Sequence, residues 1–235
     1  MPVPASIRKF FTLNMSITSI KKRAKAGTLE VEHLLKEAKY PDEALAMALD
    51  ELSAELQWHA SGVQEKGGLH VPLATWAQVV STYCREGFDG LIRLSSEPGL
   101  ATFVLALFEE LKTKDALSAL MKAFGNYISE PCRDCGMSSN IAATLNLMLS
   151  FKPGADADAS QAAQLRAFLR TLHSCTQDDH QRALALLALR GIGDEESAEF
   201  ALAQHLRDPW QETPKLVAKH IRKRLLLQSA SAVVE

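Results

Sequence analysis

The clearest hydrophobic pattern in the chain lies between Thr176 and Gln228. Thr176 can accept the first free amides of a helix, and the apolar side chains that follow recur with a helical rather than an alternating period. They are Ala183, Leu184, Leu186, Leu187 and Leu189. Gly191 and Gly193 come directly after them. The stretch therefore predicts a helix that ends in a tight, glycine-containing turn.

Two further helices are predicted after this turn. Asp194 can cap the second helix, whose first turn carries two glutamates that favour a helix N-terminus, and Pro209 ends it. Thr213 and Pro214 form a cap-and-proline start for the third helix. Its expected apolar face consists of Leu216, Val217, Ile221 and Leu225. Each helix has one apolar face, so we expect neighbours in the sequence to bury one another.

The rest of the chain repeats this alternation of apolar helical stripes and short polar breaks. A long helix is predicted after Asp42, and Asp115 is the expected cap of another. The remaining helices are predicted near 29–39, 73–85, 89–94, 100–112, 116–128, 141–151 and 161–173. The longest breaks are predicted at 61–72, 132–140 and 153–160. No run alternates β-branched and polar residues as a half-buried strand would.

The pattern thus predicts an all-α protein of about ten antiparallel helices. We expect a basic N-terminal segment at 1–27, a single helical domain at 28–228 and a flexible tail at 229–235.

The sequence from Ala183 to Ala203 resembles a HEAT-type repeat. An apolar helix, the turn Arg190-Gly191-Ile192-Gly193-Asp194 and a glutamate-rich start of the next helix carry this resemblance. Helix pairs in the second half recur about every 35–45 residues, which is the range of helical repeat proteins. The resemblance implies an α-solenoid-like stack of helices that offers an extended binding surface.

Composition restricts the function classes. The 235 residues have a formal net charge of −2 and only 6% are aromatic, so neither total charge nor base stacking favours nucleic acid. No apolar run has the length of a membrane span, and the N-terminus lacks a secretory signal pattern. Four cysteines in a chain this long do not make a disulfide scaffold. We expect a cytoplasmic protein, with a mitochondrial transit peptide in the basic residues 1–25 as the alternative.

Charge is separated along the chain. Residues 29–65 carry nine acids against two lysines, and we expect the acidic helix after Asp42 to dock a basic protein. Tryptophans could anchor the same partner, because this residue is enriched at binding hot spots. A solvated helix face and a packed loop tryptophan are the alternatives. The expected partner-binding residues are Glu43, Asp50, Glu51, Glu55, Trp58 and Trp210.

The last predicted helix is basic. Its candidate phosphate-binding residues are Lys215, Lys219, Arg222 and Lys223. Cations near a helix C-terminus also stabilise its dipole, and a terminal solenoid helix has a charged outer face. The helix is similar to the end of alkylation-repair DNA glycosylases built from HEAT-like repeats. That resemblance implies nucleic-acid binding or DNA repair as an alternative function.

Cys132 and Cys135 have the two-residue gap that lets two thiolates reach one metal ion. His173 and Cys175 are the nearest candidates for further ligands, and they could join only if two helix ends converged. Because half of a zinc site is missing, we expect no metal and no cofactor. A zinc- or thiol-dependent factor is the alternative.

The seven histidines are scattered, and no serine or cysteine stands in a nucleophile-elbow context, so we expect no catalytic residue. The expected function is therefore a non-catalytic protein-binding module. It would be an adaptor, or an immunity-type inhibitor that sequesters a basic partner such as a toxin.

Overall fold

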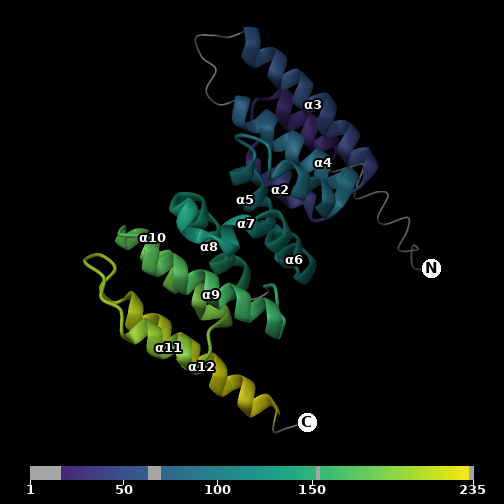
Figure 1. Cartoon of the computed structure of the whole chain (residues 1–235). Helices are drawn as coiled ribbons and strands as arrows, with labels where there is room; N and C mark the ends of the chain where they lie inside the picture. Colours follow the sequence, from purple (N-terminus) through teal and green to yellow (C-terminus); the bar gives the residue numbers. More distant parts are fainter. Residues whose placement is uncertain (1–16, 63–69, 152–153, 233–235) are drawn as a thin grey trace, which may run out of the picture. The chain divides into compact units, whose positions relative to one another are not determined.

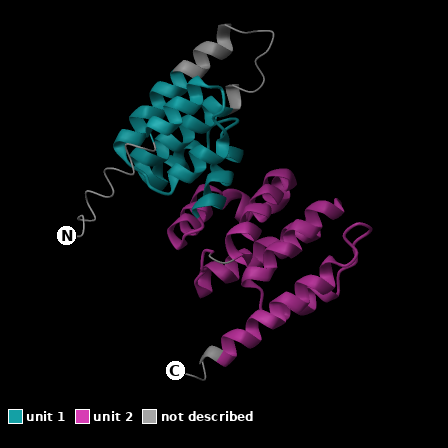
Figure 2. Cartoon of the chain, turned by 180° about the vertical axis from the view of Figure 1, so that it is seen from behind, with its two compact units in different colours: residues 1–111 teal, residues 112–235 magenta. Residues whose placement is uncertain are grey.

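The computed structural model describes residues 17–62, 70–151 and 154–232, with side chains over 17–54, 73–151 and 154–230. Every regular element in these ranges is helical and none is a strand, so the predicted all-α class is confirmed. The chain falls into two compact units, residues 1–111 and 112–235 (Figure 2). That residues 28–228 form a single domain stays a prediction.

Unit 1 is a set of amphipathic helices packed through their apolar faces. A helical segment at 17–25 precedes α2 (Val31–Ala38), α3 (Glu43–Gly62), α4 (His70–Leu94) and α5 (Ala101–Leu111). Helices α3 and α4 lie side by side, and α2 packs against α4 and α5 (Figure 1). Leu34, Leu49, Leu91 and Phe108 are fully buried among them. Removal of these faces from water stabilises the packing.

The helix boundaries of unit 1 follow the predicted pattern with two exceptions. Asp42 starts α3 as predicted, because its Oδ1 accepts a hydrogen bond from the Ala44 amide at 2.7 Å. The predicted loop at 61–72 is too long, since α3 continues to Gly62 and α4 begins at His70. The separate helices predicted at 73–85 and 89–94 meet at Gly87, whose φ of 62° interrupts the helical backbone of α4.

Unit 2 contains the stretch with the clearest hydrophobic pattern. Its short elements are α6 (Lys114–Ala123), α7 (Gly125–Ser129) and the 3-10 helix η1 (Pro131–Arg133). They are followed by α8 (Cys135–Ser150), α9 (Ala159–Cys175), α10 (Asp179–Ile192), α11 (Glu195–Leu202) and α12 (Thr213–Ala232). Helix α10 is central, because it packs against α8, α9 and α12, while α11 packs against α12 (Figure 1).

Capping side chains set the helix starts in unit 2, and three of them differ from the prediction. Thr113 rather than Asp115 caps α6, accepting from the Ala116 amide at 3.1 Å. Asp134 caps α8, which therefore begins at Cys135 and not near residue 141. Asp178 rather than Thr176 caps α10, because the Asp178 carboxylate reaches the His180 and Gln181 amides. Asp194 caps α11 as predicted, accepting from the Ser197 amide at 2.9 Å.

The predicted glycine turn is a place of close helix packing. Helix α10 continues through Gly191 to Ile192, so the helix does not stop at Gly191 as predicted. A Cβ atom on Gly191 would lie 2.6 Å from the Leu149 carbonyl oxygen, and one on Gly193 would lie 2.6 Å from Ile221 Cδ1. The two glycines therefore let α10 approach α8 and α12 closely.

The apolar face predicted for α12 is partly wrong. Val217 and Ile221 are buried as expected, but Leu216 is 45% exposed and Ala218 takes its place in the core. A membrane-spanning helix, which needs both length and sustained apolarity, is not found in the described part of the chain.

Candidate functional site

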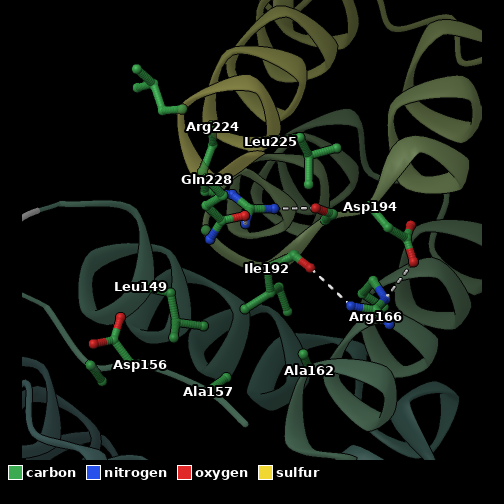
Figure 3. Close-up of a pocket in the computed structure, with 14 residues that line it drawn as sticks. Leu149, Asp156, Ala157, Ala162, Arg166, Ile192, Asp194, Arg224, Leu225 and Gln228 are labelled. Carbon is green, nitrogen blue, oxygen red and sulfur yellow. Dashed lines mark hydrogen bonds and ion pairs between the residues drawn. The ribbon is translucent and has the colours of Figure 1, made fainter. Parts of the chain in front are cut away.

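A cavity of about 610 Å³ lies in unit 2 where the C-terminal end of α10 meets α8, α9 and α12 (Figure 3). Leu149, Ile192 and Leu225 supply apolar walls, and Arg166 and Arg224 supply the cations. Cavities of this volume accommodate small molecules in many proteins. Whether this one can do so depends on what its arginines already bind.

Both arginines bind the carbonyl groups that a helix C-terminus leaves without a partner. Arg166 Nη1 donates to the Ile192 carbonyl at 3.0 Å. Arg224 Nε donates to the Arg190 carbonyl at 3.2 Å, and Arg224 Nη2 donates to the Gly193 carbonyl. A cation at this end of α10 also interacts favourably with the helix dipole. Figure 3 shows the two side chains pointing toward these atoms.

Asp194 connects the end of α10 to the start of α11. Its carboxylate accepts hydrogen bonds from the Ser197 amide and hydroxyl and forms ion pairs with Arg166 at 3.0 Å and Arg170 at 3.4 Å. Burial alone would raise the pKa of Asp194, but the Ser197 hydrogen bonds and the Arg166 charge outweigh it and leave this pKa lowered. The carboxylate is therefore held in its charged form as a structural cap.

The cavity is thus a helix junction whose charged groups already have partners. Burial lowers the pKa of Arg224, and the nearby Arg166 charge adds to this effect. The sequence did not predict this junction, since Arg166 and Arg224 lie 26 and 31 residues from the carbonyls of Ile192 and Gly193. Contacts between residues so far apart in the sequence leave no local sequence pattern.

A second hollow lies on the outer surface of α11 and α12, and we call it the α12 groove. It has a volume of about 680 Å³ and is more open than the cavity. Leu226 and Leu227 in its wall are 71% and 61% exposed, and Leu202 is 41% exposed. The lining residues of the α12 groove are Leu202, Lys215, Ala218, Lys219, Arg222, Lys223, Leu226 and Leu227.

All four candidate phosphate-binding residues lie in the α12 groove, but two of them have acidic partners. Lys215 Nζ is 3.6 Å from Glu212 Oε2. Arg222 binds the carboxylates of Glu195 and Glu199 on α11. Lys219 and Lys223 are exposed and have no ion pair within the described residues. These two lysines therefore carry the free positive charge of the groove.

The acidic residues predicted to bind a partner are largely engaged inside unit 1. Arg85 binds Asp50 and lies 3.6 Å from Glu43, and the Ser81 hydroxyl also donates to Asp50. Lys21 Nζ binds Glu51 at 2.7 Å. The side chains of Glu55 and Trp58, two further predicted partner-binding residues, lie outside the described residues. Pairing with Arg85 and Lys21 reduces the negative charge that this face offers to a basic protein.

Trp210, the other predicted anchor, is half-buried in the segment between α11 and α12. Its ring lies 5.3 Å from the His180 ring at an interplanar angle of 39°. The Trp210 amide also donates to the Arg207 carbonyl at 2.8 Å. The residue therefore has an intramolecular packing partner that the sequence pattern did not indicate.

The two helix ends that carry the candidate metal ligands do converge. Cys135 Sγ lies 3.8 Å from Cys175 Sγ, and Cys132 also interacts with Cys175. His173 does not join them, because its buried ring packs edge-on against Phe200 at 5.4 Å. Among the side chains that the structure describes, no group of three or more His, Cys, Asp or Glu residues is arranged to hold a metal ion.

Comparison with known proteins found no matching family model, no matching curated protein and no matching solved structure. A function must therefore be inferred from the geometry of the chain itself.

Proposed function

We propose that this chain is a non-catalytic protein-binding module that holds its partner in the α12 groove. The observation that carries the proposal is the exposure of Leu226 and Leu227 directly beside Lys219 and Lys223. A partner that removed these exposed leucine surfaces from water would gain free energy.

The chemistry of the groove favours one kind of partner. A helix with apolar residues on one face would cover the leucines, and acidic residues beside that face would pair with Lys219 and Lys223. Helix α12 has no acid between Glu212 and Glu235, and the α11 acids Glu195 and Glu199 are paired with Arg222. We therefore infer an acidic, amphipathic helix of another protein as the ligand.

Two other partners fit the described surfaces less well. Nucleic acid could use the lysines, but phosphate contacts would leave the leucines in water, and the chain is poor in aromatic residues for base stacking. A basic protein would need free carboxylates near Glu43, Asp50 and Glu51, and these have partners in unit 1.

We extend the proposal to architecture and setting. Asp194 caps α11 directly after the Gly191 to Gly193 segment, as the HEAT-type resemblance implies, and we propose a HEAT-like α-solenoid arrangement for the helices. An adaptor or a stoichiometric inhibitor in the cytoplasm is the role that such a module would serve.

The test is retention of a partner from an extract of the source cells on the immobilised full-length chain. We expect one protein to be retained at near-stoichiometric amount and to resist nuclease treatment. The double variant Lys219→Glu/Lys223→Glu should lose at least 90% of it. The matched control, Lys36→Glu/Lys114→Glu, makes the same change in net charge at two exposed lysines outside the groove and should retain it fully.

Two results would contradict this proposal. Removal of the retained material by nuclease would assign the groove to nucleic acid. A basic protein held equally by both double variants would move the function to the acidic residues of unit 1.

A further inference from the structure

Three of the four cysteines of the chain gather at one place in unit 2, which we call the thiol cluster: Cys132, Cys135 and Cys175. Cys132 lies in η1, Cys135 is the first residue of α8, and Cys175 is the last residue of α9. Helix α9 packs against both η1 and α8, which brings the two chain segments together. The fourth cysteine, Cys84, lies in α4 of unit 1.

Local hydrogen bonds fix the turn that carries Cys132 and Cys135. Asp134 Oδ1 accepts from the Met137 amide at 2.9 Å, and the Ser138 hydroxyl donates to the Pro131 carbonyl at 3.1 Å. The Ser139 hydroxyl donates to the Cys135 carbonyl at 2.6 Å. The backbone around these two thiols is therefore set by the fold and needs no cross-link to form.

The distances within the cluster suit a covalent bond between two of its sulfurs. Cys135 Sγ and Cys175 Sγ are 3.8 Å apart, in van der Waals contact. A disulfide requires about 2.05 Å between sulfurs, so a rotation of the two side chains must bring them about 2 Å closer. Both residues are half-buried, while Cys132 is exposed to solvent. Cys132 is therefore more accessible to a dissolved oxidant than Cys135 and Cys175 are.

We propose that the thiol cluster is an oxidation site at which a low-molecular-weight disulfide, such as oxidised glutathione, converts Cys135 and Cys175 into a disulfide, with Cys132 as the entry thiol. This proposal does not depend on the function of the α12 groove.

The reaction proceeds by three exchanges. The Cys132 thiolate attacks one sulfur of the oxidant, breaks its S–S bond and releases one small thiolate. Cys175 loses its proton to solvent and attacks Cys132 Sγ, which expels the second small thiolate. The Cys135 thiolate then attacks Cys175 Sγ and returns Cys132 as a free thiolate. In total two protein thiols lose two protons and two electrons, and the oxidant is reduced to two small thiols.

The environment of Cys175 controls the rate of the second exchange. Burial and, after it, the neighbouring Cys132 and Cys135 thiols together raise the pKa of Cys175 to about 12. Little of Cys175 is thiolate near neutral pH, and the thiolate is the attacking species. Disulfide formation should therefore become faster as the pH rises from 7 to 9.

The experiment treats the purified full-length chain with oxidised glutathione, followed by peptide mapping without reduction and by counting of free thiols in denaturant. We expect a Cys135–Cys175 cross-linked peptide and a fall from four free thiols to two, both reversed by dithiothreitol. Cys84→Ser is the matched control and should form the same cross-link. Cys175→Ser and Cys175→Ala should abolish it, and Cys132→Ser should slow its formation at least tenfold without changing the product.

Other outcomes would overturn the proposal. They are a stable mixed disulfide at Cys132 without any cross-link, a cross-link that includes Cys84, and a Cys132–Cys135 disulfide as the final product. Zinc bound to the reduced protein in a stoichiometric amount that protects the three thiols would also overturn it, because the cluster would then be a metal site.

Discussion

Arg222 and Arg224 lie two positions apart on α12, yet they make different kinds of contact. Arg222 pairs with Glu195 and Glu199 at the surface, where solvent and salt screen the charges. Arg224 donates hydrogen bonds to the Arg190 and Gly193 carbonyls at the end of α10. A buried carbonyl that loses a charged donor has no water to replace it, so the second contact should matter more for stability.

The first prediction compares these two arginines. Arg224→Ala should lower the free energy of unfolding by about 2 kcal/mol, the range for a hydrogen bond to a charged group. Arg222→Ala should lower it clearly less. Urea unfolding followed by circular dichroism measures both. Equal losses for the two variants would show that the α10 carbonyls do not need Arg224.

His173 is a buried titratable group whose shifted pKa makes stability depend on pH. Burial and, to a smaller extent, the Arg182 charge lower its pKa, Asp179 opposes them, and the net pKa is about 4. Its Nε2 atom has no hydrogen-bond partner within the described part of the chain. The folded protein therefore binds fewer protons at this site than the unfolded chain, whose histidine has a pKa near 6.5.

The second prediction follows from the sign of that difference. Above about pH 6.5, His173 is neutral in both the folded and the unfolded state, so it does not lower the free energy of unfolding. As the pH falls from 6.5 to 4, the unfolded state gains the proton first, and stability decreases by on the order of 3 kcal/mol from this residue. His173→Gln removes the titrating group, so its unfolding free energy should fall less steeply across this window than that of the wild type. Identical slopes in urea unfolding would assign the pH dependence to other groups.

At the level of elements, the packing of α10 against α8 depends on Gly191. The Leu149 carbonyl oxygen and Cβ occupy the space that any side chain at this position would need. By contrast, a Cβ atom added to Gly125 in α7 would have no neighbouring atom within 4 Å, and this residue has no positive φ. The two helical glycines thus provide a matched pair for the same substitution.

The third prediction concerns this pair. Gly191→Ala should destabilise the protein by about 1–3 kcal/mol, because α8 and α10 must separate to admit the methyl group. Gly125→Ala should be neutral or should stabilise by up to about 1 kcal/mol, since alanine reduces the freedom of the unfolded chain. Thermal unfolding compares them, and a neutral Gly191→Ala would contradict the close packing.

The helices could be predicted from the sequence because their signals are local. The apolar positions Val217 and Ile221 require only the period of one helix, and the structure buries both. Caps were harder to predict, since Thr176 and Asp178 both stand before α10 and only the fold selects the carboxylate. The Thr176 hydroxyl instead donates a hydrogen bond to Gln181 Oε1 at 2.6 Å.

Contacts between distant segments could not be predicted in this way. Cys132 and Cys135 stood out by their spacing, but their approach to Cys175 depends on where α9 ends, 40 residues after Cys135. The α12 groove was missed for a related reason, because Leu202 of α11 and Leu226 of α12 line it together and are far apart in the sequence. The packing of α10 and α11 against α12 defines which side of the basic helix is free.

At the scale of the whole molecule, the two units differ in how many of their candidate binding charges are already paired. In unit 1 the predicted partner-binding acids that the structure describes are paired with Arg85 and Lys21. In unit 2 the α12 groove combines exposed leucines with Lys219 and Lys223. We therefore propose that another protein binds unit 2 through this groove.

The most direct measurement of that claim places a photo-crosslinking amino acid at position 226, in place of the exposed Leu226, in the full-length chain. The control chain carries it at position 47, in place of Met47, which is 56% exposed on unit 1. Both chains are irradiated in an extract of the source cells, and the adducts are identified by mass spectrometry. We predict one protein, joined through an acidic amphipathic helix, at position 226 and not at position 47. Adducts to nucleic acid at position 226, or the same protein at both positions, would contradict the claim.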